Sequence, residues 1–352
     1  MSELKSLIAQ TLLVGFEGAD INEVRDELAP LIELNAAGFI LFSNHFKQRQ
    51  LKKNIVDYFQ TQSLIEGLQA INGKHHPLPL LMAVDYEGGQ VDRLGHLRGA
   101  PVTCSAKESA RLPQSLFNQQ AQSMADFCHQ LGFNINFAPV VDLDLSNGQG
   151  CINMLDRSYG TNAQQVSKLA WQFMQPFLQL GIACCLKHFP GHGSAMGDTH
   201  LQLVDVSDTY EMDELNPFQQ ILHHQHPLVM VMTAHIINRN LDSTGLPSTL
   251  SRVMLNQQLR NKWHYDGVIV SDDLQMHALA HHYSLSERLA MAMNAGCDLL
   301  IIGNQMSYDE PMAIIDMMAS LVNNGDISLS RLQQAADRVR KLRQRINNKE
   351  VV

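Results

Sequence analysis

No apolar run in this sequence approaches the ~18 residues that a membrane-spanning helix needs. The chain also lacks an excess of basic side chains, because 26 Lys and Arg stand against 35 Asp and Glu for a net charge of −9. Binding to nucleic acid requires a basic face, so this balance argues against that class of function. No low-complexity tract or linker divides the 352 residues. We therefore expect no membrane and no nucleic-acid partner, and we expect residues 1–352 to form a single domain.

Cysteine pairs are also missing. The six cysteines include no CxxC spacing, and several fall within apolar strand or helix patterns, where Cys acts as a small buried side chain. The N-terminal stretch carries Glu3 and Gln10 where a signal peptide would be uniformly apolar. Both observations indicate a reduced cytoplasmic protein without a disulfide framework.

What the chain does contain is a regular alternation of short apolar runs with longer amphipathic stretches. Continuous apolar runs are typical of strands buried on both faces, and their alternation with helices indicates a parallel sheet. Eight such runs favour an α/β fold of the (β/α)8 TIM-barrel type over an open doubly wound sheet. The predicted strands are Thr11–Phe16, Gly38–Phe42, Leu78–Asp85, Ile135–Asp142, Ile182–Lys187, Leu228–Thr233, Gly267–Ser271 and Asp298–Gly303. The predicted helices are Gln48–Leu68, Gln114–Leu131, Gln164–Leu180, Glu211–His224, Leu285–Ala295, Asp309–Asn323 and Ser330–Asn347.

The last of these helices is rich in basic residues. It carries Arg331, Arg338, Arg340, Lys341, Arg343 and Arg345. A polyanion-binding face would explain this composition, and so would a solvated helix end that complements the helix dipole. The second explanation is favoured.

The stretch K-H-F-P-G-H-G-S-A-M-G-D-T-H, residues 187–200, concentrates chemically active side chains after the fifth predicted strand. Pro190 and the glycines exclude a continuing strand or helix, so this stretch is a loop. It carries three histidines together with Lys187 and Asp198. Because a (β/α)8 barrel builds its active site from the loops after its strands, we expect this loop to carry chemistry.

Other predicted strands also end in polar residues. A rim of carboxylates, Arg, Lys and His suits a small polyol, whose hydroxyl groups need bidentate partners. Several of these residues have a structural alternative, since a strand-end Asp often caps the next helix. That role is expected for Asp273, whereas for Asp142 and His235 the structural and functional roles are equally supported. The residues at these ends are Asp85, Glu87, Arg93, Asp142, Asp144, Asp156, Arg157, Lys187, His188, His235, Asp272 and Asp273.

The motifs at these strand ends resemble those of family 3 glycoside hydrolases, in particular the single-domain bacterial β-N-acetylglucosaminidase (β-hexosaminidase) branch. The matching segments are D-Y-E-G-G-Q-V-D-R-L, K-H-F-P-G-H-G…D-T-H-L and D-G-V-I-V-S-D-D-L-Q-M, and the resemblance extends over nearly the whole chain. It implies a retaining exo-β-N-acetylglucosaminidase that releases terminal β-linked GlcNAc, and a role in peptidoglycan recycling.

The resemblance also implies roles for individual residues. Asp272, the first Asp of S-D-D, matches the nucleophile that forms a covalent glycosyl-enzyme. His200 matches the acid/base, held by Asp198, on a mobile loop after the fifth strand. An imidazole titrates near neutrality, which suits both halves of that role. Substrate-binding positions match at Asp85, Arg93, Arg157, Lys187 and His188, while His192 is expected to be structural and Met276 to pack under the nucleophile.

The chain departs from the family pattern at a few positions. Thr199 stands where Ser is usual, and Tyr86 and Asp92 replace more common Gln residues. None of these changes removes a catalytic group, but they leave the preference for the leaving group open. The resemblance implies no cofactor and no metal, and a small carbohydrate partner, a GlcNAc-containing saccharide or muropeptide. The oligomeric state stays open, with a monomer favoured.

Four other functions compete with this one. A metallohydrolase could use His188, His192, Asp198 and His200 as ligands, although Pro190 breaks the helix that would place His188 and His192 on one face. The others are a β-N-acetylglucosaminide phosphorylase, another family 3 β-glycosidase, and a sugar-binding protein without turnover. A dinucleotide site is poorly supported, because G-H-G-S-A-M-G has the wrong spacing of its third glycine.

Overall fold

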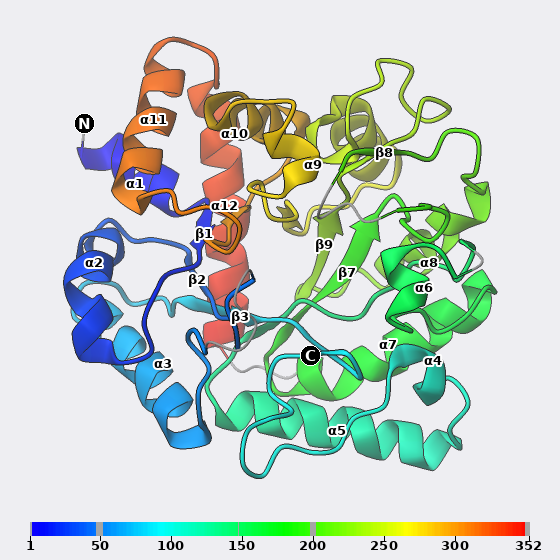
Figure 1. The fold of residues 1–352 in the computed structure, drawn as a ribbon. Coiled ribbons are helices and arrows are strands. Elements are labelled where there is room, and N and C mark those ends of the chain that lie inside the picture. Colours follow the sequence, from blue (N-terminus) through cyan, green and yellow to red (C-terminus); the bar gives the residue numbers. More distant parts are fainter. Residues whose placement is uncertain (1, 47–51, 147, 198–201, 349–352) are drawn as a thin grey trace.

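Eight parallel strands form the centre of the fold, and each corresponds to a predicted one. The computed structural model describes residues 2–46, 52–146, 148–197 and 202–348. Figure 1 shows the strands ringed by helices. The strands are β1 (Leu12–Val14), β2 (Gly38–Ile40), β3 (Leu81–Val84), β6 (Ile135–Asn136), β7 (Ala183–Phe189), β9 (Val229–Thr233), β11 (Ile269–Val270) and β12 (Leu300–Ile302).

The sheet closes on itself. Its hydrogen-bonded order is β11-β9-β7-β6-β3-β2-β1-β12, so every strand lies beside its neighbours in sequence and β1 pairs with β12. The two ends meet where the Ser271 N–H donates to Leu299 O (2.9 Å) and the Leu299 N–H donates to Ile269 O (3.2 Å). The predicted (β/α)8 barrel is confirmed, and the open doubly wound sheet is wrong.

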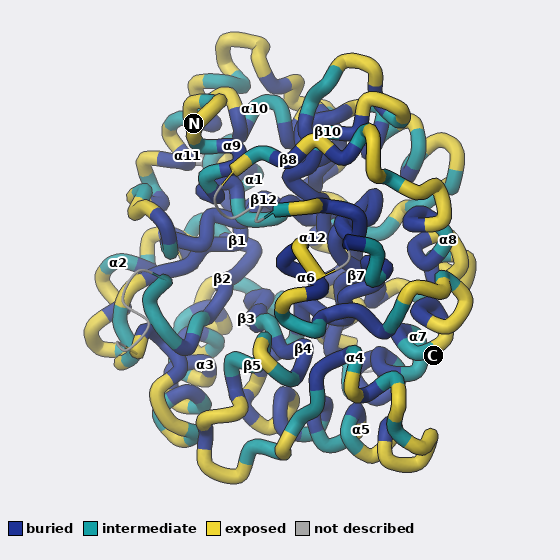
Figure 2. The backbone as a smooth tube through the Cα atoms, turned by 45° about the vertical axis from the view of Figure 1, so that its right-hand side comes forward, coloured by how far each residue is buried: buried dark blue, intermediate teal, exposed yellow. Residues whose placement is uncertain are grey.

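The strands are buried because apolar side chains cover both of their faces. All residues of these eight strands are buried, which explains why their sequences read as continuous apolar runs. In Figure 2 the ring of strands is dark blue, whereas yellow is concentrated on the outer helices and loops. The polar residues at the strand ends are therefore the ones that the barrel can present to a ligand.

Several helices begin where the sequence supplies a side-chain cap. Capping boxes are formed, for example, by Asp20 with Glu23, by Asp57 with Gln60, and by Ser284 with Glu287. None of the helices in the described part of the chain combines the length and the apolar character that crossing a bilayer requires. The helices are α1 (Ser2–Ala9), α2 (Ile21–Glu33), α3 (Tyr58–Asn72), α4 (Ala106–Ser109), α5 (Gln114–Gln130), α6 (Cys151–Met154), α7 (Ala163–Gln179), η1 (Met212–Leu215), α8 (Asn216–Leu222), η2 (Ser248–Leu250), η3 (Val253–Lys262), α9 (His277–Ala280), α10 (Leu285–Ala295), α11 (Pro311–Asn323) and α12 (Leu329–Asn347).

The predicted helices are incomplete, and one begins at the wrong residue. The helix predicted from Gln48 begins ten residues later, at Tyr58, because the Asp57 side chain caps it there. The helices α1, α2 and η3 and the short helices α4, α6 and η2 were not predicted. Of these, α2 had a visible signal in its Asp20/Glu23 capping box, whereas η3 is a π-helix without a side-chain cap.

Two arginines of α12 hold the helix against the end of the barrel where the strands begin. Arg343, only 1% exposed, donates to Pro79 O (2.8 Å) and to the Asn35 side chain (3.0 Å). Arg331 donates to the buried carboxylate of Asp298 (2.9 Å), which also binds Arg260. Arg331 and Arg343 thus satisfy buried groups of the barrel, which the prediction missed, whereas Arg340, Lys341 and Arg345 are exposed, as expected for a solvated helix end.

Candidate functional site

A cavity of about 490 Å³ opens at the end of the barrel where the strands finish. Most of the site residues predicted from the sequence line it, together with several apolar side chains. Two short strand pairs lie among the loops after the barrel strands, β4 (Tyr86–Gly88) with β5 (Val91–Asp92) and β8 (Val204–Asp205) with β10 (Ile236–Ile237). The predicted residues in the lining are Asp85, Arg93, Arg157, Lys187, His188 and Asp272.

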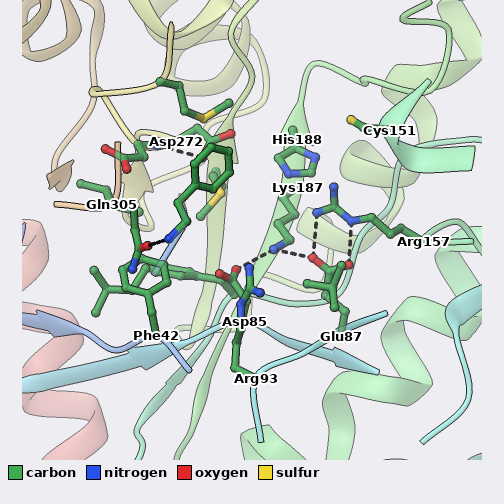
Figure 3. A pocket seen from close by; sticks show the side chains of 18 of the residues that line it. Phe42, Asp85, Glu87, Arg93, Cys151, Arg157, Lys187, His188, Asp272 and Gln305 are labelled. Carbon is green, nitrogen blue, oxygen red and sulfur yellow. Dashed lines mark hydrogen bonds and ion pairs between the residues drawn. The ribbon is translucent and has the colours of Figure 1, made fainter. Parts of the chain in front are cut away.

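One wall of the cavity is an array of alternating charges (Figure 3). The Lys187 Nζ lies 3.0 Å from Asp85 Oδ1 and 2.7 Å from Glu87 Oε1. Arg157 donates to the same Glu87 carboxylate through two N–H groups, each at 2.8 Å. The array joins the ends of three strands, because Lys187 is on β7, Asp85 and Glu87 follow β3, and Arg157 is in the loop after β6.

Glu87 is the hub of this array. Burial alone would raise the pKa of its carboxyl, but Arg157 and Lys187 outweigh burial and hold the pKa well below its ordinary range. The pKa of Lys187 is raised, since Asp85 and Glu87 outweigh the burial that would lower it. Both groups are therefore charged at neutral pH, and Glu87 fixes the positions of the two cations.

Replacing Glu87 with Gln is expected to lower the free energy of unfolding by about 3 to 5 kcal/mol at pH 7, because Arg157 and Lys187 lose a buried counter-charge. Urea unfolding followed by circular dichroism measures the change. The difference from wild type should shrink as the pH falls below 4.5, because a carboxylate with a depressed folded-state pKa stabilises only above its ordinary value.

The control for Glu87 is Glu66→Gln on the exposed face of α3. That change should stay within about 0.5 kcal/mol of wild type. Equal stability of the Glu87→Gln and Glu66→Gln proteins would show that the charge array contributes nothing to the fold.

Among the residues that the structure describes, two buried donors in the cavity wall find no hydrogen-bond partner. One is Nε of Arg93, whose backbone N–H donates to Asp85 O (3.4 Å). The other is Nε2 of Gln305, whose Oε1 accepts from the Phe46 N–H (3.0 Å). Buried donors normally find a partner, so both are placed to meet an acceptor on a bound ligand. Gln305 was not predicted from the sequence.

Asp272 lies in the turn after β11, on the side of the cavity across from Glu87 and Arg157 (Figure 3). Its backbone N–H donates to Thr233 Oγ1 (3.4 Å), and its Oδ1 accepts from the Asp273 N–H (2.8 Å). Met276 is buried and lines the same cavity. The chain therefore presents a carboxylate to the cavity from the end of the seventh barrel strand.

Asp273 does not cap the following helix as predicted. Its Oδ1 accepts from the N–H groups of Gln275 (3.0 Å) and Gly303 (3.2 Å), so it ties the turn after β11 to the end of β12. Burial raises its pKa to about 6. The His235 ring donates from Nε2 to Asp273 O (2.9 Å) and contacts Thr249 Oγ1 through Nδ1 (2.7 Å). Both residues support the turn that holds Asp272.

The loop after β7 begins at the cavity wall. Asp142 accepts from the backbone N–H groups of His188 (3.0 Å) and His192 (2.8 Å), and it also contacts His188 Nδ1 (2.8 Å). Burial, followed by the neighbouring His188, lowers the pKa of His192 to about 4, so its ring is neutral at pH 7. Asp142 thus anchors the loop. Asp198 and His200, predicted as the acid/base pair, lie outside the described residues.

The structure thus brings together six of the eight predicted site residues around one cavity. Glu87 and Gln305 are the additions. Glu87 stood in the E-G-G motif and had a visible signal as a strand-end carboxylate, but nothing in the sequence paired it with Arg157. Gln305 carried no signal, because an amide after an apolar strand is common in any loop.

Solved structures of known proteins share this architecture. A glycoside hydrolase family 3 β-N-acetylglucosaminidase from Paenibacillus sp. superposes with a TM-score of 0.85 and 31% identity, over 98% of this chain and 62% of that one. A β-N-acetylhexosaminidase from Beutenbergia cavernae has the same fold, with a TM-score of 0.83 and 23% identity over 97% of this chain and 98% of that one.

Curated relatives agree with the fold comparison. A protein named beta-hexosaminidase from Haemophilus influenzae is 34% identical over 307 residues, which are 84% of this chain and 80% of that protein. One of the same name from Hydrogenovibrio crunogenus is 31% identical over 349 residues, 94% of this chain and 88% of that protein. The model of the glycosyl hydrolase family 3 N-terminal domain matches residues 3–342. With its motifs set around one cavity of a (β/α)8 barrel, this chain belongs to glycosyl hydrolase family 3.

Proposed function

We propose that this chain is a retaining exo-β-N-acetylhexosaminidase that releases terminal β-linked GlcNAc. The observation that carries the proposal is the lining of the cavity. The Asp272 carboxylate lies on one side of it, and the charge array of Asp85, Lys187 and Glu87 lies on the other. The names of the relatives, beta-hexosaminidase and β-N-acetylglucosaminidase, support the same substrate class.

In the first step of the proposed mechanism, an Asp272 oxygen attacks the anomeric carbon of the sugar and the bond from that carbon to the leaving oxygen breaks. His200 gives its proton to the leaving oxygen. In the second step His200 takes a proton from water, the water oxygen bonds to the anomeric carbon, and the Asp272 carboxylate is released. Asp198 would orient the imidazole and favour its protonated form.

The charge array and its neighbours would bind the hydroxyl groups of the sugar. Arg157 uses two of its N–H donors on Glu87, and a guanidinium has five, so donors remain for a ligand. Asp85 accepts from Lys187 and retains acceptor capacity toward the cavity. Arg93 and His188 complete the set that we propose for substrate binding.

The test is an initial-rate comparison of aryl β-GlcNAc, β-GalNAc and β-glucoside substrates, with and without inorganic phosphate. We expect the highest kcat/KM for a β-GlcNAc substrate and no stimulation by phosphate. A product that carries phosphate would identify the phosphorylase alternative, and a preference for the β-glucoside would identify another family 3 β-glycosidase. Binding of GlcNAc without turnover of any substrate would identify a sugar-binding protein.

Activity is expected to persist in full after treatment with excess EDTA, because the proposed acid, base and nucleophile are all side chains. Among the described residues, no three His, Cys, Asp or Glu side chains are grouped so that they could hold a metal ion. Dialysis against EDTA followed by an assay in metal-free buffer makes the measurement. Loss of activity that Zn²⁺ restores would favour the metallohydrolase instead.

We further propose a cytoplasmic enzyme whose residues 1–352 form one catalytic domain and act as a monomer on GlcNAc-containing cell-wall fragments. Five of the six cysteines are buried, and Cys104 is partly exposed. Buried cysteines that act as small apolar side chains are typical of proteins in a reducing compartment. Comparing hydrolysis of a GlcNAc–anhydroMurNAc fragment with that of a chitin disaccharide would separate cell-wall recycling from chitin breakdown.

A further inference from the structure

Two buried carboxylates, which belong to different elements, accept hydrogen bonds from the backbone of the first half of the loop after β7. Asp142 follows β6 and binds the backbone at His188 and His192. Glu214 belongs to η1, which follows the loop in sequence, and its Oε2 accepts from the N–H groups of Gly193 (2.8 Å) and Ser194 (3.3 Å). The backbone of residues 188–194 is therefore held by carboxylates that come from both flanks.

The contact between Glu214 and the loop is tight. Glu214 is 0% exposed, and a Cβ added at Gly191, where φ is +126°, would lie 2.6 Å from the Glu214 Cβ. A Cβ at Gly193 would lie 1.9 Å from Leu143 O, so the loop backbone also packs closely against the segment after β6. Only glycine permits this close approach at either position. The backbone of this part of the loop is therefore held in place by direct contacts, and we call these contacts of Glu214 with residues 191–194 the clamp.

Neighbouring residues of the same segment strengthen the clamp. The Tyr210 hydroxyl donates to Pro190 O (2.8 Å), and the Thr209 hydroxyl donates to Ser194 O (3.2 Å). Glu214 does not line the substrate cavity. Any effect it has on the reaction must therefore pass through the loop that it holds.

We propose that Glu214 is a positioning residue for the acid/base, which fixes the loop backbone at Gly193 and Ser194, from where the chain continues to Asp198 and His200. This inference rests on the proposed function, because it assigns a purpose to the held loop. A fixed stem limits where an imidazole six residues farther on can reach, and proton transfer to a leaving oxygen tolerates little misplacement.

The charge of Glu214 changes in the neutral range. Burial raises its pKa to about 7, and Asp142 acts in the same direction, while the hydrogen bonds from Ser194 and Glu211 oppose the rise. Tyr210 and Glu211 are titratable residues beside it: burial keeps the Tyr210 phenol neutral, and the Glu211 backbone N–H donates to Glu214 Oε1 (3.4 Å). Because an ionised carboxylate accepts N–H groups more strongly than a protonated one, the clamp should tighten as the pH rises through about 7.

The effect of Glu214 on stability runs the other way. Its folded-state pKa lies above the ordinary 4.5, so its contribution to stability is full below pH 4.5 and is lost as the pH rises to about 7. A Gln at this position removes both trends. As the pH rises through about 7, the contacts of Glu214 with the loop should strengthen, while its contribution to global stability should fall. These opposite trends distinguish a positioning role from a merely structural one.

The experiment compares Glu214→Gln with Asp213→Asn, an exposed acid-to-amide change in the same turn. The substrates are a GlcNAc disaccharide, with a poor leaving group, and an activated aryl β-GlcNAc, each assayed from pH 5.5 to 8.5. For Glu214→Gln we expect kcat/KM on the disaccharide to fall by about 10- to 100-fold, part of the contribution of a general acid, with KM within about threefold. The kcat/KM on the aryl substrate should fall by less than about threefold. The rise of kcat/KM on the disaccharide through pH 7 should disappear, while Asp213→Asn behaves as wild type.

Hydrogen–deuterium exchange gives a readout that does not depend on turnover. Peptides covering residues 188–205 should exchange faster in Glu214→Gln than in Asp213→Asn, with the rest of the barrel unchanged. Equal exchange in the two variants, or equal loss on both substrates together with a lowered unfolding temperature, would overturn the positioning role. A wild-type protein that hydrolyses neither substrate would reject the proposed function, while the exchange rates would still decide whether Glu214 holds the loop.

Discussion

Replacing Asp272 with Asn is expected to lower kcat on an aryl β-GlcNAc substrate by on the order of 10⁵-fold, with little change in the unfolding temperature. The covalent step has no other nucleophile in the proposed mechanism, and an amide oxygen cannot form and release a glycosyl ester as a carboxylate does. The change is nearly isosteric, so the backbone contacts of the turn, such as the N–H donated to Thr233 Oγ1, are retained. Steady-state kinetics with circular dichroism as a check on folding make the measurement.

The control for Asp272 is Asp326→Asn, an exposed residue between α11 and α12. It should leave kcat and KM unchanged. An Asp272→Asn protein that is properly folded and keeps more than about a tenth of the wild-type kcat would remove Asp272 from the mechanism, and the nucleophile would have to be sought elsewhere in the cavity.

Replacing His200 with Ala is expected to lower kcat/KM on a GlcNAc disaccharide by about 10³-fold, which is the usual contribution of a general acid. An activated aryl glycoside needs little protonation of its leaving group, so its kcat/KM should fall by less than about tenfold. The parameter kcat/KM is the appropriate one, because it reports on the step that breaks the glycosidic bond. It does not depend on how fast water later attacks the glycosyl-enzyme.

The control for His200 is the exposed His75→Ala, between α3 and β3, which should leave both substrates unaffected. An equal loss on the disaccharide and the aryl glycoside would reject the acid/base role. The ratio of the two losses is decisive, because damage to substrate binding or to the fold would lower both parameters together.

The fold was predictable from the sequence because buried strands and amphipathic helices each have a characteristic local pattern of apolar residues. The runs at Leu228–Thr233 and Asp298–Gly303 contain the strands β9 and β12, and the helix Leu285–Ala295 has the predicted bounds. The failures have local causes. The helix predicted from Gln48 ignored the cap at Asp57, and η3 carries no side-chain cap that would mark its start.

The site was less predictable than the fold, because its chemistry depends on pairs that are far apart in sequence. Glu87 and Arg157 are 70 residues apart, yet their buried side chains form a bidentate pair. Asp142 and Glu214 were a strand-end carboxylate and an ordinary helix residue in the sequence. In the structure they hold the same loop. No periodicity or motif carries that information.

The sequence alone determined the barrel, the order of its strands and which residue types gather at the strand ends, since hydrophobic periodicity and strand-end motifs are local properties of the chain. The tertiary structure decided which charged side chains form ion pairs, which carboxyl groups have a shifted pKa and which side chains line the cavity. The physical reason is that pairing, burial and pKa depend on distances across the closed barrel, and those distances exist only once β11 has met β12.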